Sequence, residues 1–193
     1  KFSGERSIGQ HGGNLRTLIG RSKDVRYLVV WGYARLMGYD HNFEMHADIL
    51  KAYTVDEGRI FTFTLRKGHR WSNGDPFTTE DFRYWWEDVA NNKDISPSGP
   101  PVVMLAEGKL PTFEVLDEVT VRFTWETPNP FFLSRLAGAS PLFVYRPSAY
   151  LKKFHAKYTD EAALNKKAKT EGQRNWAALH NRLDNMYKFS NPD

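Results

Sequence analysis

The sequence predicts an α/β or α+β fold in which helices pack on a mixed β-sheet. Residues 61–65 and 119–125 alternate apolar and polar side chains, which is the period of half-buried strands. Between them, residues 82–89 carry apolar side chains at helical spacing. Hairpins interspersed with helices in this way are typical of a sheet that is covered by helices.

Length and composition indicate a chain that folds around a core of its own. The 193 residues are 40% hydrophobic and 15% aromatic, which excludes a disordered chain. The length favours one domain or little more. No apolar run is long enough to span a bilayer, so we expect no direct membrane insertion. The absence of cysteine excludes disulfides and thiolate metal sites.

The net charge of +4 comes from the last quarter of the chain. From residue 146 to the end there are ten Lys and Arg against five Asp and Glu, spread along stretches that look helical. A solvated helix face accounts for them better than a phosphate-binding surface does, so we expect no nucleic-acid partner. A stand-alone nucleic-acid- or carbohydrate-binding module, using the aromatic residues and this basic quarter, is the alternative function.

The first third of the chain is expected to form a strand, a helix and a hairpin. Residues 14–19 follow a Gly-Gly pair and resemble a strand. Residues 26–37 repeat apolar side chains at helical spacing and predict a buried helix. Residues 52–55 and 59–66, joined by an Asp-Glu-Gly turn, predict the first hairpin.

A compact corner follows, in which residues 65–86 read LRKGHRWSNGDPFTTEDFRYWW. The Asn, Gly and Pro of the segment SNGDP favour a turn. Thr78 is a natural helix N-cap, and acidic residues occupy the first turn, where the helix dipole favours negative charge. One apolar face of the predicted helix contains Phe82, Trp85, Trp86 and Val89.

The rest of the chain predicts a second hairpin and three helices. Residues 112–116 and 120–125 flank a turn and form the hairpin. A Pro-Asn-Pro segment, residues 128–130, opens a short helix. Residues 147–157 and 173–187 are expected to be helical as well.

Some side chains suggest chemistry, but each set has a simpler structural interpretation. Asp40, His41, Glu44 and His46 offer cation ligands, yet the two histidines are five positions apart and the segment is typical of a turn. Ser140 lies in Gly-Ala-Ser-Pro-Leu, which lacks the second glycine of a nucleophile elbow. We therefore expect no metal, no cofactor, no catalytic residue and no enzymatic activity.

Two further features are also assigned to structure. The glycines of residues 9–13 lack a preceding strand, which argues against a phosphate cradle. The tryptophans offer stacking platforms for bases or sugars. Four of them sit at core-like positions, where burial is favoured, namely Trp71, Trp85, Trp86 and Trp125.

Residues 65–82 resemble the signature of the family 5 extracellular solute-binding proteins, the peptide and nickel type that serve ABC importers. The family pattern runs from a strand through Leu-Arg-Lys-Gly, a basic and aromatic step, Asp or Asn-Gly and Pro into Thr-Ala-Glu-Asp-Val. Thr79 stands where Ala is commoner, and Phe82 where Val is commoner. Four other segments are similar to the family in the right order: residues 32–39, 47–55, 113–130 and 147–154.

The resemblance implies a periplasmic-binding-protein type II-like lobe from a periplasmic receptor whose two lobes close over a ligand. Such a receptor captures a peptide or similar small solute and delivers it to an ABC permease. Within the family the ligand stays open between a di- or oligopeptide, an opine, an oligosaccharide, a nickel chelate and haem, with a peptide expected most. We expect the chain to be an N-terminal fragment. Residues 1–38 would begin the main lobe, residues 39–140 would form a small subdomain containing the hairpins, and residues 141–193 would return to the main lobe. No signal peptide is recognised in the sequence.

The resemblance also places two loops at the border of the ligand cleft. One consists of Gly20, Arg21, Ser22 and Lys23, and the other contains Ser96 and Ser98. The cationic side chains could pair with an anionic group of the ligand, and the hydroxyls could donate or accept hydrogen bonds. Ordinary loop exposure accounts for the same residues. The corner at residues 65–86 is expected to be scaffold and not a ligand contact.

Overall fold

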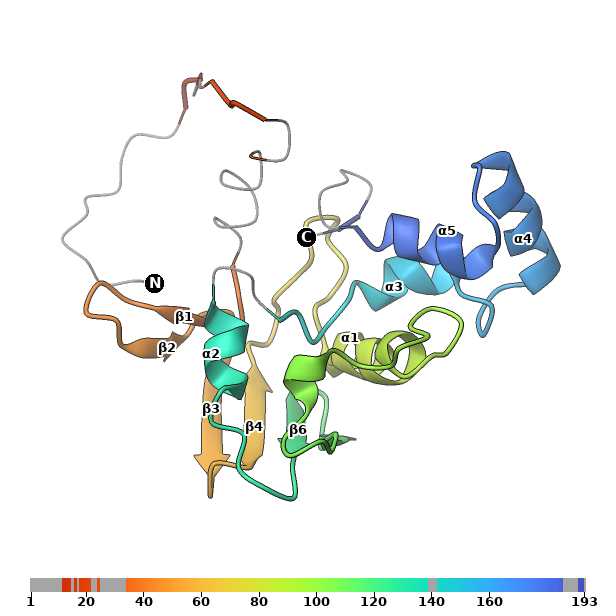
Figure 1. Ribbon diagram of the computed structural model, residues 1–193. Coiled ribbons are helices and arrows are strands. Elements are labelled where there is room, and N and C mark those ends of the chain that lie inside the picture. The colour runs from red at the N-terminus through yellow and green to blue at the C-terminus, as the bar shows by residue number, and fades with distance from the viewer. Residues whose placement is uncertain are drawn as a thin grey trace.

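The computed structural model of the protein describes residues 12–14, 16, 18–21, 24, 34–138, 142–185 and 191–192. Groups of strands and groups of helices follow one another along this part of the chain (Figure 1). The strands are β1 (Met37–Tyr39), β2 (Met45–Ala47), β3 (Leu50–Asp56), β4 (Ile60–Leu65), β5 (Thr112–Val115) and β6 (Thr120–Thr124). The helices are α1 (Thr79–Arg83), the π-helix η2 (Tyr84–Ala90), the 3-10 helix η3 (Val102–Met104), α2 (Phe132–Ala137), α3 (Ser148–Leu151), the 3-10 helix η4 (Lys152–Phe154), α4 (Glu161–Thr170) and α5 (Trp176–Leu183).

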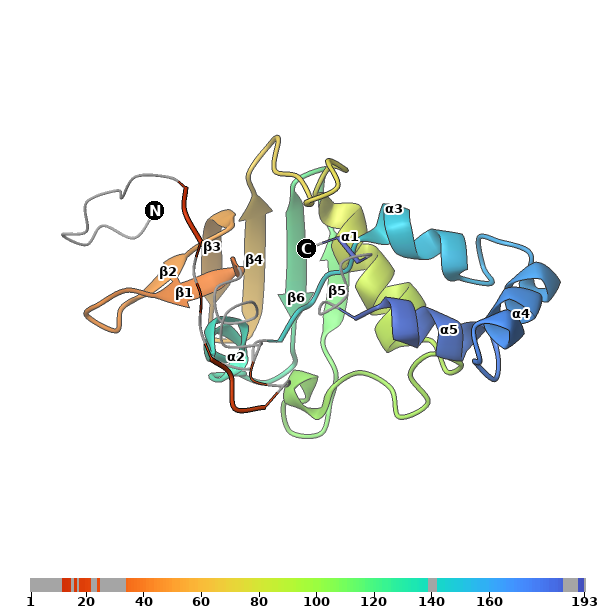
Figure 2. The same ribbon diagram turned by 90° about the horizontal axis from the view of Figure 1, so that it is seen from above.

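Both predicted hairpins form, and they join into one four-stranded sheet. Its order is β3-β4-β6-β5, and β1 and β2 form a separate two-stranded ribbon (Figure 2). The predicted fold class, helices packed on a sheet, is confirmed. Every strand pair in the described part of the chain is antiparallel, so the expected mixed sheet is not found there. Hairpin turns of a few residues can join only antiparallel neighbours, which accounts for β3–β4 and β5–β6. The two hairpins also meet in antiparallel orientation, through β4 and β6.

The core lies on one face of this sheet. The predicted alternation is confirmed, since the odd-numbered residues of β4 are buried and the even-numbered ones are half-buried. Phe132 of α2 packs on this face, with its ring centroid 5.1 Å from that of Phe61 and 4.7 Å from that of Trp125. Aromatic pairs at such separations add to the stabilisation that burial provides. The side chains buried on the core face are Phe61, Phe63, Leu65, Val121, Phe123 and Trp125.

The tryptophans of the described residues pack in or against the core, as predicted for Trp71, Trp85, Trp86 and Trp125. Trp85, Trp125 and Trp176 are buried, and Trp71 and Trp86 are half-buried against the same core. The indole Nε1 of Trp125 donates to the backbone oxygen of Met104 at 2.8 Å. A buried indole N–H with a carbonyl partner is a satisfied core group, and this argues against a base-stacking role for that ring.

Asp81 ties the predicted corner together. Its Oδ2 accepts hydrogen bonds from Trp71 Nε1 (3.1 Å) and from the Thr78 backbone N–H (2.9 Å). Its Oδ1 accepts from the backbone N–H (3.0 Å) and the hydroxyl (2.7 Å) of Ser148. Burial raises the pKa of Asp81, and the four donors oppose that shift because they stabilise the ionised form. One carboxylate therefore connects the turn, the start of α1 and the start of α3.

The strand predicted at residues 14–19 and the helix predicted at residues 26–37 are not found among the described residues. Of residues 14–19, positions 15 and 17 lie outside the described residues, and the other four are not in a strand. Of the predicted helix at residues 26–37, only 34–37 are described, and they are not helical. Met37 belongs to β1, because the chain is extended there: Asp48 Oδ2 accepts from the Arg35 backbone N–H at 2.9 Å, and the Asp48 N–H donates to Leu36 O at 3.0 Å.

The helix predicted to start after Thr78 begins there, but its second half is a π-helix. Thr78 and Asp81 form a capping box at its start. From Tyr84 to Ala90 the wider turn aligns Arg83 with Asp88, five residues further on, and their side chains pair at 2.9 Å. Apolar spacing alone cannot distinguish an α-helix from a π-helix here, because either type of helix can bury Phe82 and Val89.

The C-terminal helices differ from the prediction mainly in their extent. The expected helix at residues 147–157 is α3 followed by η4, and it ends at Phe154. The expected helix at residues 173–187 is confirmed as α5 within its described part, with Asn175 as N-cap. Helix α4, capped by Asp160, was not predicted as a separate element. Its single apolar stripe is short, with only Leu164 and Ala168 buried.

The neighbouring residues Phe131 and Phe132 provide a matched test of the core. Phe132 is fully buried, whereas Phe131 is 69% exposed. We expect Phe132→Ala to lower the free energy of unfolding by about 3–5 kcal/mol, because it leaves a cavity between α2 and the sheet. Phe131→Ala should cost less than about 0.5 kcal/mol. Urea denaturation measures both, and equal losses would contradict this description of the core.

Candidate functional site

The two loops predicted to border a ligand cleft are only partly described. Ser22 and Lys23 lie outside the described residues, whereas Gly20 and Arg21 are exposed. In the other loop, which follows η2, Ser98 is exposed and Ser96 is half-buried, with its backbone N–H bonded to Asn92 O at 2.7 Å. In Figure 1 the red segment containing residues 18–21 lies away from the loop that follows η2. The described atoms do not bring the two loops into contact, and their ligand role stays a prediction.

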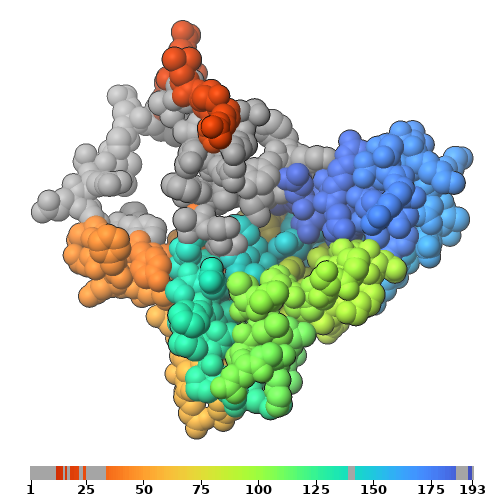
Figure 3. All heavy atoms as spheres, in the orientation of Figure 1, coloured from red at the N-terminus to blue at the C-terminus, as the bar shows by residue number. Residues whose placement is uncertain are grey.

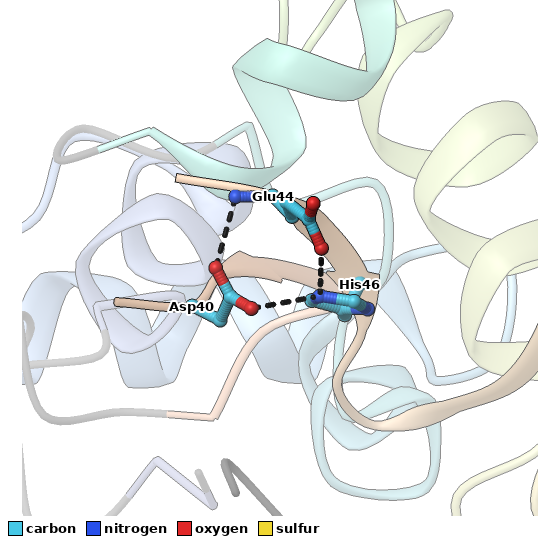
Figure 4. Close-up of side chains that lie close together, drawn as sticks. All are labelled: Asp40, Glu44 and His46. Atoms are coloured by element: carbon cyan, nitrogen blue, oxygen red, sulfur yellow. Dashed lines mark hydrogen bonds and ion pairs between the residues drawn. The ribbon is translucent and has the colours of Figure 1, made fainter. Parts of the chain in front are cut away.

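A second candidate lies at the β1–β2 ribbon, where the structure brings together Asp40, Glu44 and His46 (Figure 4). His46 Nε2 is 3.2 Å from Asp40 Oδ2 and 3.9 Å from Glu44 Oε2. One ligand atom from each of the three residues lies within 4.8 Å of the others. An imidazole and two carboxylates in this arrangement are a ligand set that divalent cations accept. The sequence had named all three, but His41 is not part of the group.

Asp40 has a structural role that accounts for its position without an ion. Its Oδ1 accepts the backbone N–H groups of Asn42 (2.8 Å) and Glu44 (2.9 Å), which closes the predicted turn. These backbone donors, first that of Glu44, hold the pKa of Asp40 below its ordinary value. Phe43 in this turn has φ of 62° and is 85% exposed. The same contacts that form the turn therefore bring the three side chains together.

A buried carboxylate on η2 forms the largest polar network in the described part of the chain. Asp88 is 3% exposed at its side chain. Its Oδ1 pairs with Lys157 Nζ at 2.6 Å, and its Oδ2 accepts from the Tyr158 hydroxyl (2.6 Å) and Arg83 Nη2 (2.9 Å). Burial alone would raise the pKa of Asp88, but these three partners outweigh burial and hold it below its ordinary value.

The network continues on the same surface through Glu80. Its carboxylate pairs with Arg83 at 2.6 Å and with Lys152 at 2.5 Å. Lys152 and Lys157 come from the basic last quarter of the chain, so two of its cations pair within the fold and are unavailable for phosphate. Sequence analysis missed this network, because the partners are 69 to 75 positions apart. The only local signal was the run of charged residues within the predicted helix.

The helix bearing Asp88 and the corner that precedes it lie inside a recognisable family pattern. The profile of the bacterial extracellular solute-binding proteins, family 5 Middle, matches residues 44–177. The chain belongs to this family. The match covers the four-stranded sheet, the Asp81 contacts and the Asp88 network, and it confirms the resemblance noted in residues 65–82.

Curated relatives include receptors whose names refer to different solutes. The periplasmic α-galactoside-binding protein of Rhizobium meliloti (strain 1021) is 35% identical over 104 residues, which are 53% of this chain and 15% of that protein. The periplasmic oligopeptide-binding protein OppA of Escherichia coli (strain K12) is 28% identical over 123 residues, 58% of this chain and 22% of that protein. The chain thus spans a small part of the length of either relative.

Among solved structures, an oligopeptide-binding protein OppA superposes with a TM-score of 0.81 at 29% sequence identity. The superposition covers 96% of this chain and 29% of that one. The fold described above is therefore that of an OppA-like solute-binding protein, and the family is non-enzymatic. No helix among the described residues is both long and apolar enough to cross a membrane.

Asp88 and Glu87 allow the buried network to be tested against an exposed pair. Asp88→Asn removes the buried charge that three donors surround, and we expect it to lower the free energy of unfolding by about 2–4 kcal/mol at pH 7. Glu87 pairs with Arg83 at 2.6 Å, but its side chain is 51% exposed. Glu87→Gln should cost less than about 0.5 kcal/mol.

The pH dependence of the same variants gives an independent check. Because the pKa of Asp88 is depressed in the folded chain, its contribution is present above the ordinary aspartate pKa and is lost as the pH falls through the folded value. The difference in urea midpoint between the unaltered chain and Asp88→Asn should therefore shrink below about pH 4. A difference that grows on acidification would contradict the assignment.

Proposed function

We propose that this chain is part of the substrate-binding component of an ABC importer, a periplasmic receptor that captures a peptide or similar small solute for a membrane permease. The observation that carries the proposal is the superposition on OppA over 96% of the chain at 29% identity. The division into main-lobe and subdomain segments at residues 38 and 140 remains a prediction.

The mechanism of such a receptor is a hinge equilibrium between open and closed lobes. A ligand shifts that equilibrium only by its differential affinity for the closed state, so it must contact both lobes. A permease can then distinguish loaded from empty receptor by shape. In this scheme the residues described here are a rigid wall, and the contacts of Asp81 and Asp88 keep that wall from deforming when the lobes close.

The class of solute is expected to be peptide, with an α-galactoside as the second candidate. The OppA superposition supports a peptide, because a binding site for extended peptides can use backbone hydrogen bonds and hydrated side-chain pockets. The α-galactoside-binding relative has the higher identity, 35%, but over a shorter stretch of 104 residues. Each candidate calls for different polar groups in the cleft, so direct binding measurements separate them.

The loops that contain Arg21 and Ser98 are proposed to border the cleft. Arg21 would pair with an anionic group of the solute, and Ser98 would supply a hydroxyl. The competing nucleic-acid module is weakened by two observations. Trp85, Trp125 and Trp176 are buried, and Lys152 and Lys157 pair with carboxylates of α1 and η2.

Binding should require more than these 193 residues. A micromolar ligand that kept half of its binding free energy on a single lobe would bind at only about millimolar strength. In calorimetry we therefore expect no measurable heat when the 193-residue chain is titrated with a pool of tri- to pentapeptides or with raffinose. The complete gene product that contains these residues should bind one of the two probes at micromolar strength or tighter.

The outcomes separate the parts of the proposal. Submicromolar binding of either probe by the 193 residues alone would contradict the need for a second lobe. Binding of raffinose but not peptides by the complete gene product would replace the peptide by the α-galactoside. Binding of neither, together with steeply salt-dependent retention of the chain on single-stranded DNA, would overturn the receptor assignment in favour of the nucleic-acid module.

A further inference from the structure

Three aromatic polar rings meet in the interior where α5 packs against η2. They are Tyr84 of η2, His155 after η4 and His180 of α5, with exposed fractions of 0%, 2% and 0%. The centroid of the His155 ring is 6.0 Å from that of Tyr84 and 5.6 Å from that of His180. Trp176 at the start of α5 completes the group, with its centroid 5.0 Å from that of His155. We call Tyr84, His155 and His180 the histidine latch.

His155 is held in its neutral form by hydrogen bonds to both ring nitrogens. Its Nε2 donates to the backbone oxygen of Asp88 at 2.9 Å. Its Nδ1 accepts the backbone N–H of Lys157 at 3.0 Å. Protonation of Nδ1 would set its N–H against the backbone N–H of Lys157 and break the hydrogen bond between them. The neutral ring therefore fits the site, and the imidazolium does not.

His180 is also built into the fold as a neutral ring. Its Nε2 is hydrogen-bonded to the Tyr84 hydroxyl at 2.7 Å. Its Nδ1 is buried and has no hydrogen-bond partner among the described residues. A protonated His180 would carry a charge and an N–H that finds no acceptor there, in a site closed to water. The site therefore disfavours the charged form through Nδ1, since Nε2 can donate to the Tyr84 hydroxyl in either form.

The charged groups around the latch do not compensate a buried imidazolium. Asp184 at the end of α5 is the anion that favours a charged His180, and it is bound by Arg146 Nε at 2.7 Å. Around His155 the anions are Asp88 and Asp94, opposed by Lys157. Asp88 is already surrounded by three donors. The two histidines would also repel each other if both were protonated.

We propose that the histidine latch is an acid-sensitive contact that holds the α4–α5 pair on η2 at neutral pH and releases it in mild acid. Figures 1 and 3 show that α4 and α5 lie together at one end of the molecule, away from the β1–β2 ribbon. Helix α4 packs on α5, so the pair can separate from η2 as a unit without disturbing the four-stranded sheet. This inference does not depend on the solute or on the importer.

The sign of the effect follows from proton linkage. Burial lowers the pKa of His180 from 6.5 to about 4, and burial also lowers that of His155. When the latch opens, both rings reach water and bind protons at their ordinary pKa. The open form therefore gains population as the pH falls from about 6.5 towards 4. For His180 alone, the opening equilibrium should rise about 20-fold between pH 7 and pH 5.

Cysteine labelling can measure this opening, because the chain has no cysteine of its own. Ala177→Cys places a thiol in α5, where the side chain is 2% exposed, and Ala137→Cys places a matched thiol in α2, where it is 5% exposed. Each full-length variant is labelled with 4,4′-dithiodipyridine at pH 7 and pH 5. The rate is divided by that of the same variant unfolded in urea at the same pH, which removes the pH dependence of thiol reactivity.

The proposal requires the relative labelling rate at Ala177→Cys to rise about 20-fold on acidification, while that at Ala137→Cys changes little. Adding His180→Gln, which keeps a hydrogen-bonding group near Tyr84 but does not titrate, should remove most of the pH dependence. Equal changes at the two thiols would mean global unfolding and would overturn the proposal. No change at either thiol would overturn it as well.

If His180→Gln does not fold, NMR of the unaltered chain tests whether the two buried histidines are held neutral. The imidazole C–H resonances of His155 and His180 should titrate below the ordinary histidine pKa of about 6.5. Ordinary midpoints near 6.5 for both buried rings, with the fold intact, would contradict the latch.

Discussion

The buried carboxylate of Asp81 is the contact on which this arrangement depends. The turn around Trp71 and the start of α1 are close in sequence, whereas the chain returning at Ser148 is 67 positions from Asp81, and each donates hydrogen bonds to the same side chain. The backbone oxygen of Asp81 also accepts from Arg146 N at 3.1 Å. A buried charge is tolerated only when its acceptors are satisfied, so the three segments are constrained to meet at one point. The sheet, the corner and the C-terminal helices then occupy fixed relative positions.

This constraint gives a physical meaning to the motif that identifies the family. In residues 65–82 the strand supplies core side chains, the Asn-Gly turn brings Trp71 back towards the helix, and the acidic first turn supplies Asp81. Phe77 and Phe82 lie between these parts, with ring centroids 5.7 Å apart. Leu65, Phe77 and Phe82 pack in the core, and Trp71 donates to the buried carboxylate of Asp81.

The sequence predicted those features that arise from short-range patterns. Alternation in residues 61–65 and 120–125 predicted both strands and their buried faces, and Thr78 marked the beginning of α1. The patterns did not predict the π-helix, because Tyr84 and Asp88 are buried by partners from the C-terminal region. The strand at Met37 was mistaken for a helix end, since its extended form depends on Asp48. The sequence named Asp40, Glu44 and His46 as possible cation ligands. It did not show that they lie together, because this depends on the turn that Asp40 closes. The two loops proposed to border a cleft could not be tested by local patterns, because the position of a loop in a cleft depends on long-range contacts.

The free energy of unfolding of Asp81→Asn, compared with that of Glu118→Gln, tests the central claim most directly. Asn keeps the size of the side chain but turns one acceptor into a donor that faces buried N–H or O–H groups, whereas Glu118 is exposed on the β5–β6 turn. In urea denaturation at pH 7, Asp81→Asn should lose about 3 kcal/mol or more, and Glu118→Gln less than about 0.5 kcal/mol. A loss below about 1 kcal/mol for Asp81→Asn would show that the three segments hold together without this carboxylate.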